Sequence, residues 1–113
     1  MVTLAYTPER GDIVWLNFSP QAGHEQAGRR PALVLSPLEY NDKTGLALLC
    51  PITSRSKGYP FEVSLPSPYQ VTGVVLADQL RNLDWRVRNA RFECYAPHDV
   101  LASVLRMIES LLH

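Results

Sequence analysis

The stretch GDIVWLNF, residues 11–18, points to a β-protein because it is rich in β-branched and aromatic residues. In a strand, successive side chains face opposite sides. Two sets would therefore form here, Ile13, Trp15 and Asn17 on one face, and Val14, Leu16 and Phe18 on the other. We expect a strand over these residues.

Outward from this stretch, short apolar runs recur between prolines, glycines and polar segments. PALVLS (residues 31–36) and LALLCPI (residues 46–52) are continuous and short, which is typical of strands buried on both faces. Later strands are predicted over residues 61–65, 73–83, with an interruption at Asp78, and 90–96. The polar segments, which we expect to be loops or turns, are residues 19–30, 39–45, 53–60 and 66–72.

Residues 97–112 change to a helical period. Their apolar residues form one stripe: Val100, Leu101, Val104, Leu105, Ile108, Leu111 and Leu112. Pro97 suits the first turn of a helix, and Asp99 suits its positive end. About five to seven strands and one terminal helix predict a mostly β protein, a small barrel with a C-terminal α-helix packed on it. We expect residues 1–113 to form this single domain.

Composition excludes several broad classes of protein. The 113-residue chain is 46% hydrophobic and 19% charged, which excludes disorder. Its formal net charge is zero, so a protein that coats nucleic acid through a large positive field is not expected. We expect no signal peptide, no contact with a membrane, and a cytoplasmic protein in which Cys50 and Cys94 are buried, reduced thiols.

Two polar loops carry the side chains best suited to chemistry. The first ends with Arg29 and Arg30, directly before a buried strand, and arginine binds phosphate oxygens through two parallel hydrogen bonds. A solvated turn, with these arginines paired to Glu25 or Asp12, is the alternative. The second loop, TSRSKGY (residues 53–59), combines hydroxyls, two cations and an aromatic ring. That mixture suits contacts with nucleic-acid backbone and bases, although a polar hairpin has the same composition.

A third cluster sets arginines around Trp85: Arg81, Arg86, Arg88 and Arg91. Such a cluster can stack bases, and a half-buried tryptophan flanked by surface arginines is the alternative. Phosphate loops, dinucleotide glycine fingerprints, HExxH zinc motifs and cysteine–histidine metal clusters are all missing from the sequence. We therefore expect no metal and no cofactor. Spacing alone leaves a two-histidine nuclease or a Ser-His-Asp triad open without favouring either.

Four blocks of sequence carry a resemblance to a known family. They are RGDIVWLNFSP (residues 10–20), GHEQAGRRPALVLSP (23–37), YNDKTGLALLCPITSRSKGYPFEV (40–63) and VLADQLRNLDWR (75–86). In combination they resemble the MazF/PemK family of toxin endoribonucleases, the toxic halves of bacterial toxin–antitoxin pairs. The resemblance runs over nearly the whole chain, and the C-terminal helix matches in position and amphipathic pattern.

The resemblance implies a fold, an activity and two partners. The fold would be a small SH3-like barrel of the MazF/CcdB type that forms a homodimer. The activity would be that of a type II toxin: a sequence-specific, metal-independent endoribonuclease, or mRNA interferase, that cuts single-stranded RNA to 2′,3′-cyclic phosphate and 5′-hydroxyl ends. The partners would be the RNA substrate and a cognate MazE-like antitoxin, an extended segment of which obstructs the RNA site.

The resemblance also implies site residues. The family's catalytic arginine and threonine fall on Arg30 and Thr53, and Glu25 matches an acidic residue of the first loop. We expect Arg30 to stabilise charge on the scissile phosphate, because its pKa above about 12 makes arginine a poor base. Thr53 would donate a hydrogen bond to a phosphate or leaving oxygen, and Glu25 would assist proton transfer or orient Arg30. Candidate contacts for bases and phosphates are Asn17, Phe18, Arg29, Asn41, Ser54, Lys57, Gln79 and Arg81.

A non-enzymatic toxin of the same fold, which binds and inhibits DNA gyrase, is the alternative function. Gyrase-poisoning toxins such as CcdB share this fold, and a fold does not determine a function. Arg30 and Thr53 both stand in matched loop contexts, and a gyrase inhibitor has no need of them. The sequence therefore favours the endoribonuclease over the gyrase inhibitor, and over a family member that has kept only a binding role.

Overall fold

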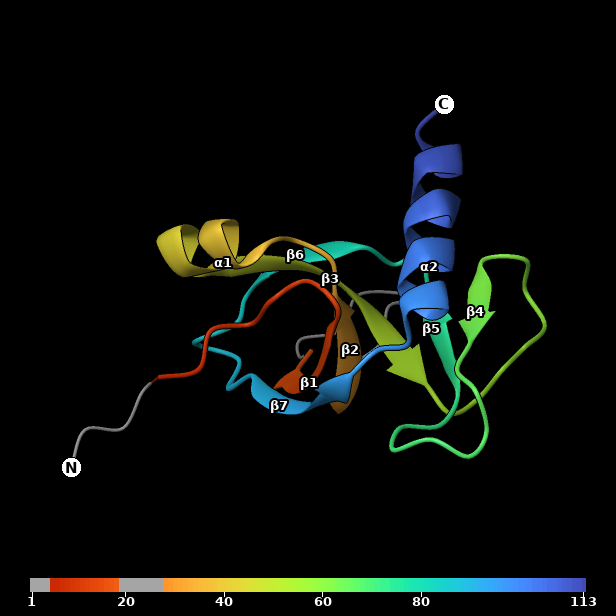
Figure 1. Cartoon of the computed structure of the whole chain (residues 1–113), viewed down its shortest axis with the longest axis horizontal. Helices are drawn as coiled ribbons and strands as arrows, with labels where there is room; N and C mark the ends of the chain where they lie inside the picture. The colour runs from red at the N-terminus through yellow and green to blue at the C-terminus, as the bar shows by residue number, and fades with distance from the viewer. Residues whose placement is uncertain (1–4, 19–27) are drawn as a thin grey trace.

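A computed structural model of the chain describes residues 5–18 and 28–113. Figure 1 shows the strands and helices of this part of the chain, in which most of the elements are strands and the last is a helix. Their bounds are β1 (Asp12–Asn17), β2 (Arg29–Val34), α1 (Leu38–Thr44), β3 (Leu46–Thr53), β4 (Glu62–Ser64), β5 (Val74–Leu76), β6 (Arg81–Asp84), β7 (Arg91–Tyr95) and α2 (His98–Leu111). The mostly β composition with a C-terminal helix confirms the predicted fold class.

The strands form one antiparallel sheet in the order β4-β5-β3-β2-β1-β7, and β6 pairs with β3 beside this path. β3 changes partner along its length: residues 46–49 pair with β6, whereas Ile52 and Thr53 pair with β5. The change falls at Cys50 and Pro51, and proline has no N–H to give to a ladder. β3 is therefore the strand that joins the two halves of the sheet.

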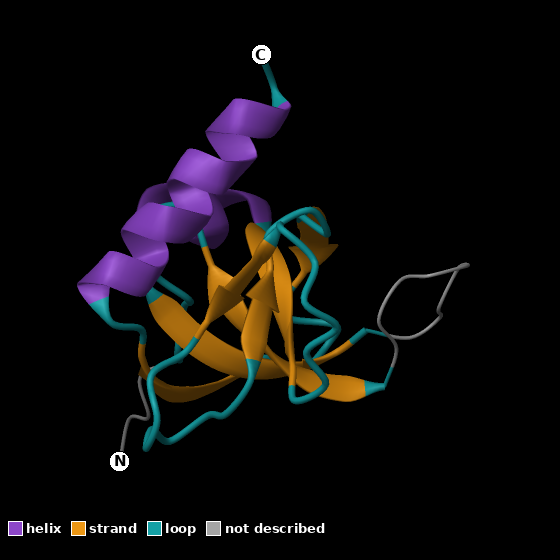
Figure 2. Ribbon diagram, turned by 90° about the vertical axis from the view of Figure 1, so that its right-hand side faces the viewer, coloured by secondary structure: helices purple, strands orange, loops and turns teal. Residues whose placement is uncertain are grey.

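The sheet is curved and open. Figure 2 shows the strands curving around a common interior, with both helices on the same side of them. The end strands of the described path, β4 and β7, do not pair with each other. The small barrel that the sequence predicted is therefore a partly wrapped sheet and not a closed ring of strands.

Both faces of the central strands are buried, which explains the continuous apolar runs. One core, on the α2 side, includes Ile13, Leu33, Leu35, Cys50, Ile52, Val100 and Val104. The other core includes Val14, Leu16, Phe18, Ala32, Val34, Leu49, Leu83 and Trp85. Neighbouring residues of each strand alternate between the two cores, as the pleat of a strand requires.

The C-terminal helix α2 follows its predicted period. Val100 and Val104 are buried against the sheet, whereas Leu105, Leu111 and Leu112 of the same stripe remain exposed. Neither helix of the described chain combines the length and apolar character needed to cross a bilayer. Cys50 and Cys94 are free and buried, as expected.

Of residues 39–45, predicted as a turn, residues 39–44 lie instead in the helix α1, and Gly45 caps its C-terminal end. The side-chain amide of Asn41 holds this helix by donating hydrogen bonds to the carbonyl oxygens of Pro8 (2.8 Å) and Ser36 (3.0 Å). A helix this short is marginal without tertiary contacts. The turn prediction was wrong because the partners that stabilise α1 come from other segments of the chain.

Candidate functional site

Arg30 and Thr53 lie on neighbouring strands. The ladder between β2 and β3 ends at the pair of Ala32 with Pro51, and Arg30 and Thr53 each lie two residues beyond that pair, at the same end of the ladder. Arg30 belongs to β2, whereas the sequence placed it in the preceding loop. The fold thus brings the two predicted catalytic residues together.

These two side chains line one pocket of about 530 Å³, here called the Arg30 pocket. Its lining residues are Arg30, Thr53, Ser54, Arg55 and Lys57. Three of these residues are cations, contributed by a strand and by the loop that follows β3. Such a concentration of positive charge attracts phosphate groups even in a chain of zero net charge.

Thr53 is fixed by its surroundings on both sides. Its side chain is buried, and its Oγ1 accepts a hydrogen bond from the backbone N–H of Arg55 at 3.2 Å. Because the oxygen accepts this bond, the hydroxyl proton is directed elsewhere and can be donated. Beside the end of β3, Gly73 directly precedes Val74 of β5; it has φ +118°, and a Cβ on it would lie 2.0 Å from the Thr53 carbonyl oxygen. Glycine is therefore required at this contact.

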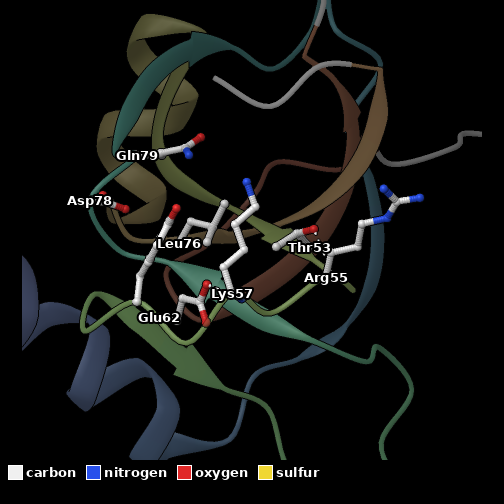
Figure 3. Close-up of a pocket in the computed structure, with 8 residues that line it drawn as sticks. Thr53, Arg55, Lys57, Glu62, Leu76, Asp78 and Gln79 are labelled. Atoms are coloured by element: carbon white, nitrogen blue, oxygen red, sulfur yellow. Dashed lines mark hydrogen bonds between the residues drawn. The ribbon is translucent and has the colours of Figure 1, made fainter. Parts of the chain in front are cut away.

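A second pocket, of about 330 Å³ and here called the Gln79 pocket, shares Thr53, Arg55 and Lys57 with the first. Its other lining residues are Tyr59, Glu62, Leu76, Asp78 and Gln79. Figure 3 shows the Lys57 amine extending to the middle of this pocket, between Thr53 and Gln79. An apolar and aromatic wall with a few polar groups suits a planar ring such as a nucleobase.

Four of the predicted RNA contacts line these two pockets or the one beside them: Arg29, Ser54, Lys57 and Gln79. Arg29 is exposed and donates to Asn17 Oδ1 (3.3 Å) and to the carbonyl oxygen of Asn89 (2.9 Å). Together with Arg88, Arg29 and Asn17 also line a further hollow of about 600 Å³. These residues therefore line pockets at the surface of the protein, and their roles in RNA binding stay predictions.

The structure does not support Phe18 and Asn41 as RNA contacts, because neither exposes any surface. Phe18 is part of the second core, and the half-buried Arg81 at the start of β6 lies 5.9 Å from its ring centroid. Asn41 makes its hydrogen bonds inside the protein, where its Oδ1 also accepts one from Ser36 Oγ at 2.5 Å. Arg81 lies against the Phe18 ring and is absent from the lining of both named pockets.

For the arginine cluster around Trp85, the structure favours the alternative of a buried tryptophan flanked by arginines over a base-stacking surface. Trp85 is 7% exposed, and its Nε1 donates to the carbonyl oxygen of Asn41 at 2.9 Å. The guanidinium of Arg86 lies 4.6 Å from the ring centroid. With one face covered and its edge bonded, this indole stabilises α1 and does not offer a stacking surface for bases.

One predicted site residue lies outside the described part of the chain, and several residues that line the pockets were not predicted. Glu25 falls within residues 19–27, outside the residues that the structure describes. The pocket residues that the predicted set left out are Arg55, Tyr59, Glu62, Leu76 and Asp78. Arg55 and Tyr59 belong to the loop already singled out by composition, and Asp78 marks the break between β5 and β6. Nothing in the sequence around Glu62 indicated that it would line a pocket.

A family model of PemK-like, MazF-like toxins of type II toxin–antitoxin systems matches residues 9–112. The chain belongs to this PemK/MazF family. The endoribonuclease toxin MazF of Escherichia coli K12 is 55% identical to it over 85 residues, which cover 75% of this chain and 76% of that relative.

Solved MazF structures share the fold described above. A crystal structure of MazF from Deinococcus radiodurans superposes with a TM-score of 0.92 at 63% identity, over 96% of this chain and 98% of that one. MazF in a MazE–MazF crystal structure from the same organism superposes with a TM-score of 0.85 at 56% identity, over 96% and 97% of the two chains. The open sheet with its C-terminal helix is thus a MazF fold.

Proposed function

We propose that this MazF-like endoribonuclease toxin cuts single-stranded RNA in the Arg30 pocket by attack of a 2′-hydroxyl on the adjacent phosphate, without a metal ion. The observation that carries the proposal is the pairing of Arg30 with a Thr53 hydroxyl in one cationic pocket. Transesterification of this kind needs charge stabilisation and proton transfer, and side chains supply both.

In this reaction the 2′-oxygen bonds to phosphorus and the bond from phosphorus to the 5′-oxygen breaks. The products are a 2′,3′-cyclic phosphate and a 5′-hydroxyl; the attacking hydroxyl loses a proton and the leaving oxygen gains one. The guanidinium of Arg30 stabilises the charge that develops on the phosphate oxygens. The Thr53 hydroxyl, oriented by the Arg55 N–H, donates to a phosphate or leaving oxygen. Glu25 is proposed for the proton transfer or for orienting Arg30.

RNA binding is proposed to extend on both sides of the scissile phosphate. Ser54 and Lys57 contact phosphate in the Arg30 pocket, and Gln79 reads the edge of a base held in the Gln79 pocket. Arg29, with Asn17 beside it, continues the cationic surface on the other side. A groove that accepts splayed bases in this way suits single-stranded RNA and confers sequence specificity.

The chain is further proposed to act in the cytoplasm as a homodimer that a cognate MazE-like antitoxin inhibits. MazF of Deinococcus radiodurans is found in MazE–MazF structures, which supports the antitoxin. The exposed leucines of α2, Leu105 and Leu111, and Leu112 directly after it offer apolar surface for association. Light scattering of the purified chain should give twice the monomer mass; a monomeric mass at micromolar concentration would contradict the dimer.

The first experiment is cleavage of a long RNA of mixed sequence in excess EDTA, with every new 5′ end mapped and the same sequence as single-stranded DNA alongside. We expect discrete RNA cuts that share a short motif, 5′-hydroxyl ends and intact DNA. A substrate with a 2′-deoxyribose only at the cleavage position should stay whole. Activity that EDTA abolishes and magnesium restores would contradict the metal-free mechanism. No cleavage by a folded, antitoxin-free preparation would favour the gyrase-binding alternative, which a supercoiling assay then tests.

A further inference from the structure

A single carboxylate holds the loop that carries Lys57. Glu62, the first residue of β4, accepts hydrogen bonds from Ser56 Oγ (2.7 Å) and the Gly58 N–H (3.1 Å) on Oε1, and from the Lys57 N–H (2.9 Å) on Oε2. Its own N–H donates to the Tyr59 carbonyl at 3.2 Å. The loop residues 54–60 are all exposed, so these hydrogen bonds, and not packing, determine the path of the loop.

The hydrogen bonds leave the charge of Lys57 available to the pocket. Glu62 binds the backbone N–H of Lys57, while the side chain extends away from the carboxylate to the middle of the Gln79 pocket (Figure 3). The donors of the loop, the Lys57 N–H foremost, lower the pKa of the Glu62 carboxyl. Glu62 is therefore ionised at neutral pH and accepts hydrogen bonds on both oxygens.

Glu62 is also anchored to the strand that carries Thr53. Within β4 and β5, Glu62 pairs with Leu76 and Ser64 pairs with Val74. Val74 in turn pairs with Thr53 of β3. The carboxylate that holds the loop and the hydroxyl at the site of reaction therefore belong to one continuous ladder, so the loop is positioned relative to Thr53.

We propose that Glu62 is a positioning residue for RNA cleavage: it holds residues 54–60 so that the Lys57 ammonium lies beside Thr53, where it contacts a phosphate of bound RNA. This inference rests on the proposed function and adds to it a residue that acts through the position of Lys57. If it is right, the effect of Glu62 on catalysis passes through Lys57, and removal of the Lys57 ammonium makes Glu62 dispensable.

A double-mutant cycle tests this dependence. Glu62→Gln keeps the size of the side chain and replaces one acceptor oxygen by an amide that cannot accept from an N–H. We expect it to lower kcat/KM for RNA about tenfold, the effect of losing one charge-assisted hydrogen bond, chiefly through a higher KM. In a Lys57→Gln background, the same change should cost less than about twofold. Glu39→Gln removes a carboxylate from α1, at the opposite end of the sheet in Figure 1, and should leave kcat/KM unchanged.

Two further measurements separate positioning from general stability. Backbone amide exchange at Lys57 and Gly58 should accelerate in Glu62→Gln while the thermal midpoint stays within a few degrees of the parent. Ser56→Ala removes one hydrogen bond from the loop side and should lower kcat/KM in the same sense by a smaller factor. An unchanged kcat/KM in Glu62→Gln, or an equal loss in both Lys57 backgrounds, would overturn the positioning role while leaving the proposed function standing. A parent protein that cuts no RNA in this assay would overturn both.

Discussion

Gly73 is the residue that shows most directly how Thr53 is held. Its φ of +118° lies outside the range that side-chain-bearing residues adopt at low cost, and its Cα faces the Thr53 carbonyl oxygen across a gap with no room for a methyl group. The last residue of β3 is therefore held by a backbone contact as well as by its pairing with Val74.

Gly73→Ala should destabilise the protein by about 3–4 kcal/mol, because it adds backbone strain and displaces the end of β3. Gly28→Ala is the matched control: its φ of +77° is also positive, but an added Cβ meets no atom of the described residues within 4 Å, so the cost should be about 1 kcal/mol. Urea unfolding of the three proteins measures both values. Equal losses in the two variants would contradict the steric argument.

Arg30→Ala and Thr53→Ala should each lower kcat about 100- to 1,000-fold, the usual effect of removing one transition-state donor. Thr53→Ser keeps the hydroxyl and should retain activity within about tenfold of the parent. Circular dichroism and light scattering of each variant report whether it remains folded and dimeric. Full activity in either alanine variant would show that the residue is not catalytic.

At the scale of elements, α1 depends on one buried asparagine. Asn41 bonds to Pro8 and Ser36 with its side chain and to Trp85 through its carbonyl, so the helix connects three segments of the chain. Asn41→Ala should therefore cost about 2–4 kcal/mol of unfolding free energy, since it leaves several buried polar groups without partners. Lys43→Ala, on the exposed face of the same helix, should change stability by less than about 0.5 kcal/mol. A similar small change for Asn41→Ala in urea unfolding would contradict this role.

The strands were predictable from sequence and α1 was not, for a physical reason. Residues 31–35 and 46–52 are apolar on both faces, and such continuous runs can be recognised in a sequence because burial on two sides excludes the polar positions of a half-exposed strand. The partners of Asn41 are distant in sequence, so a local pattern cannot show them. Likewise, the family motif identified Arg30 and Thr53, whereas the burial of Phe18 depends on tertiary structure. The hydrogen bonds of Glu62 are local in sequence, but no residue motif marks them, because they depend on the path of the loop.

At the scale of the whole molecule, burial makes stability depend on alkaline pH. Burial raises the pKa of the Cys50 thiol from 9.0 to about 12, and burial together with Asp12 raises the pKa of Tyr6. Both groups stay protonated in the folded state at pH values where the unfolded chain ionises them. Their contribution to stability is therefore complete below about pH 9 and is lost as the pH rises towards 12.

The unfolding free energy should accordingly stay level from pH 7 to about 8.5 and fall between about pH 9 and 12, by at most about 1.4 kcal/mol per pH unit for each group. Guanidinium unfolding at intervals of half a pH unit measures this profile. Cys50→Ala should lower stability at pH 7 and make the alkaline decline shallower. An alkaline decline as steep in Cys50→Ala as in the parent would show that the thiol is not its source.

The change of partner along β3 has a consequence for how such proteins diversify. The β4–β5 hairpin joins the rest of the sheet through two residue pairs, Ile52 with Val75 and Thr53 with Val74. It holds the loop with Lys57 and leads into Gln79, whereas Arg30 comes from the opposite side of β3. The segment proposed to select a base is thus physically separable from the strand that carries Arg30. On the proposed function, exchange of residues 54–79 between duplicated copies would change the RNA sequence that is cut and leave Arg30 in place.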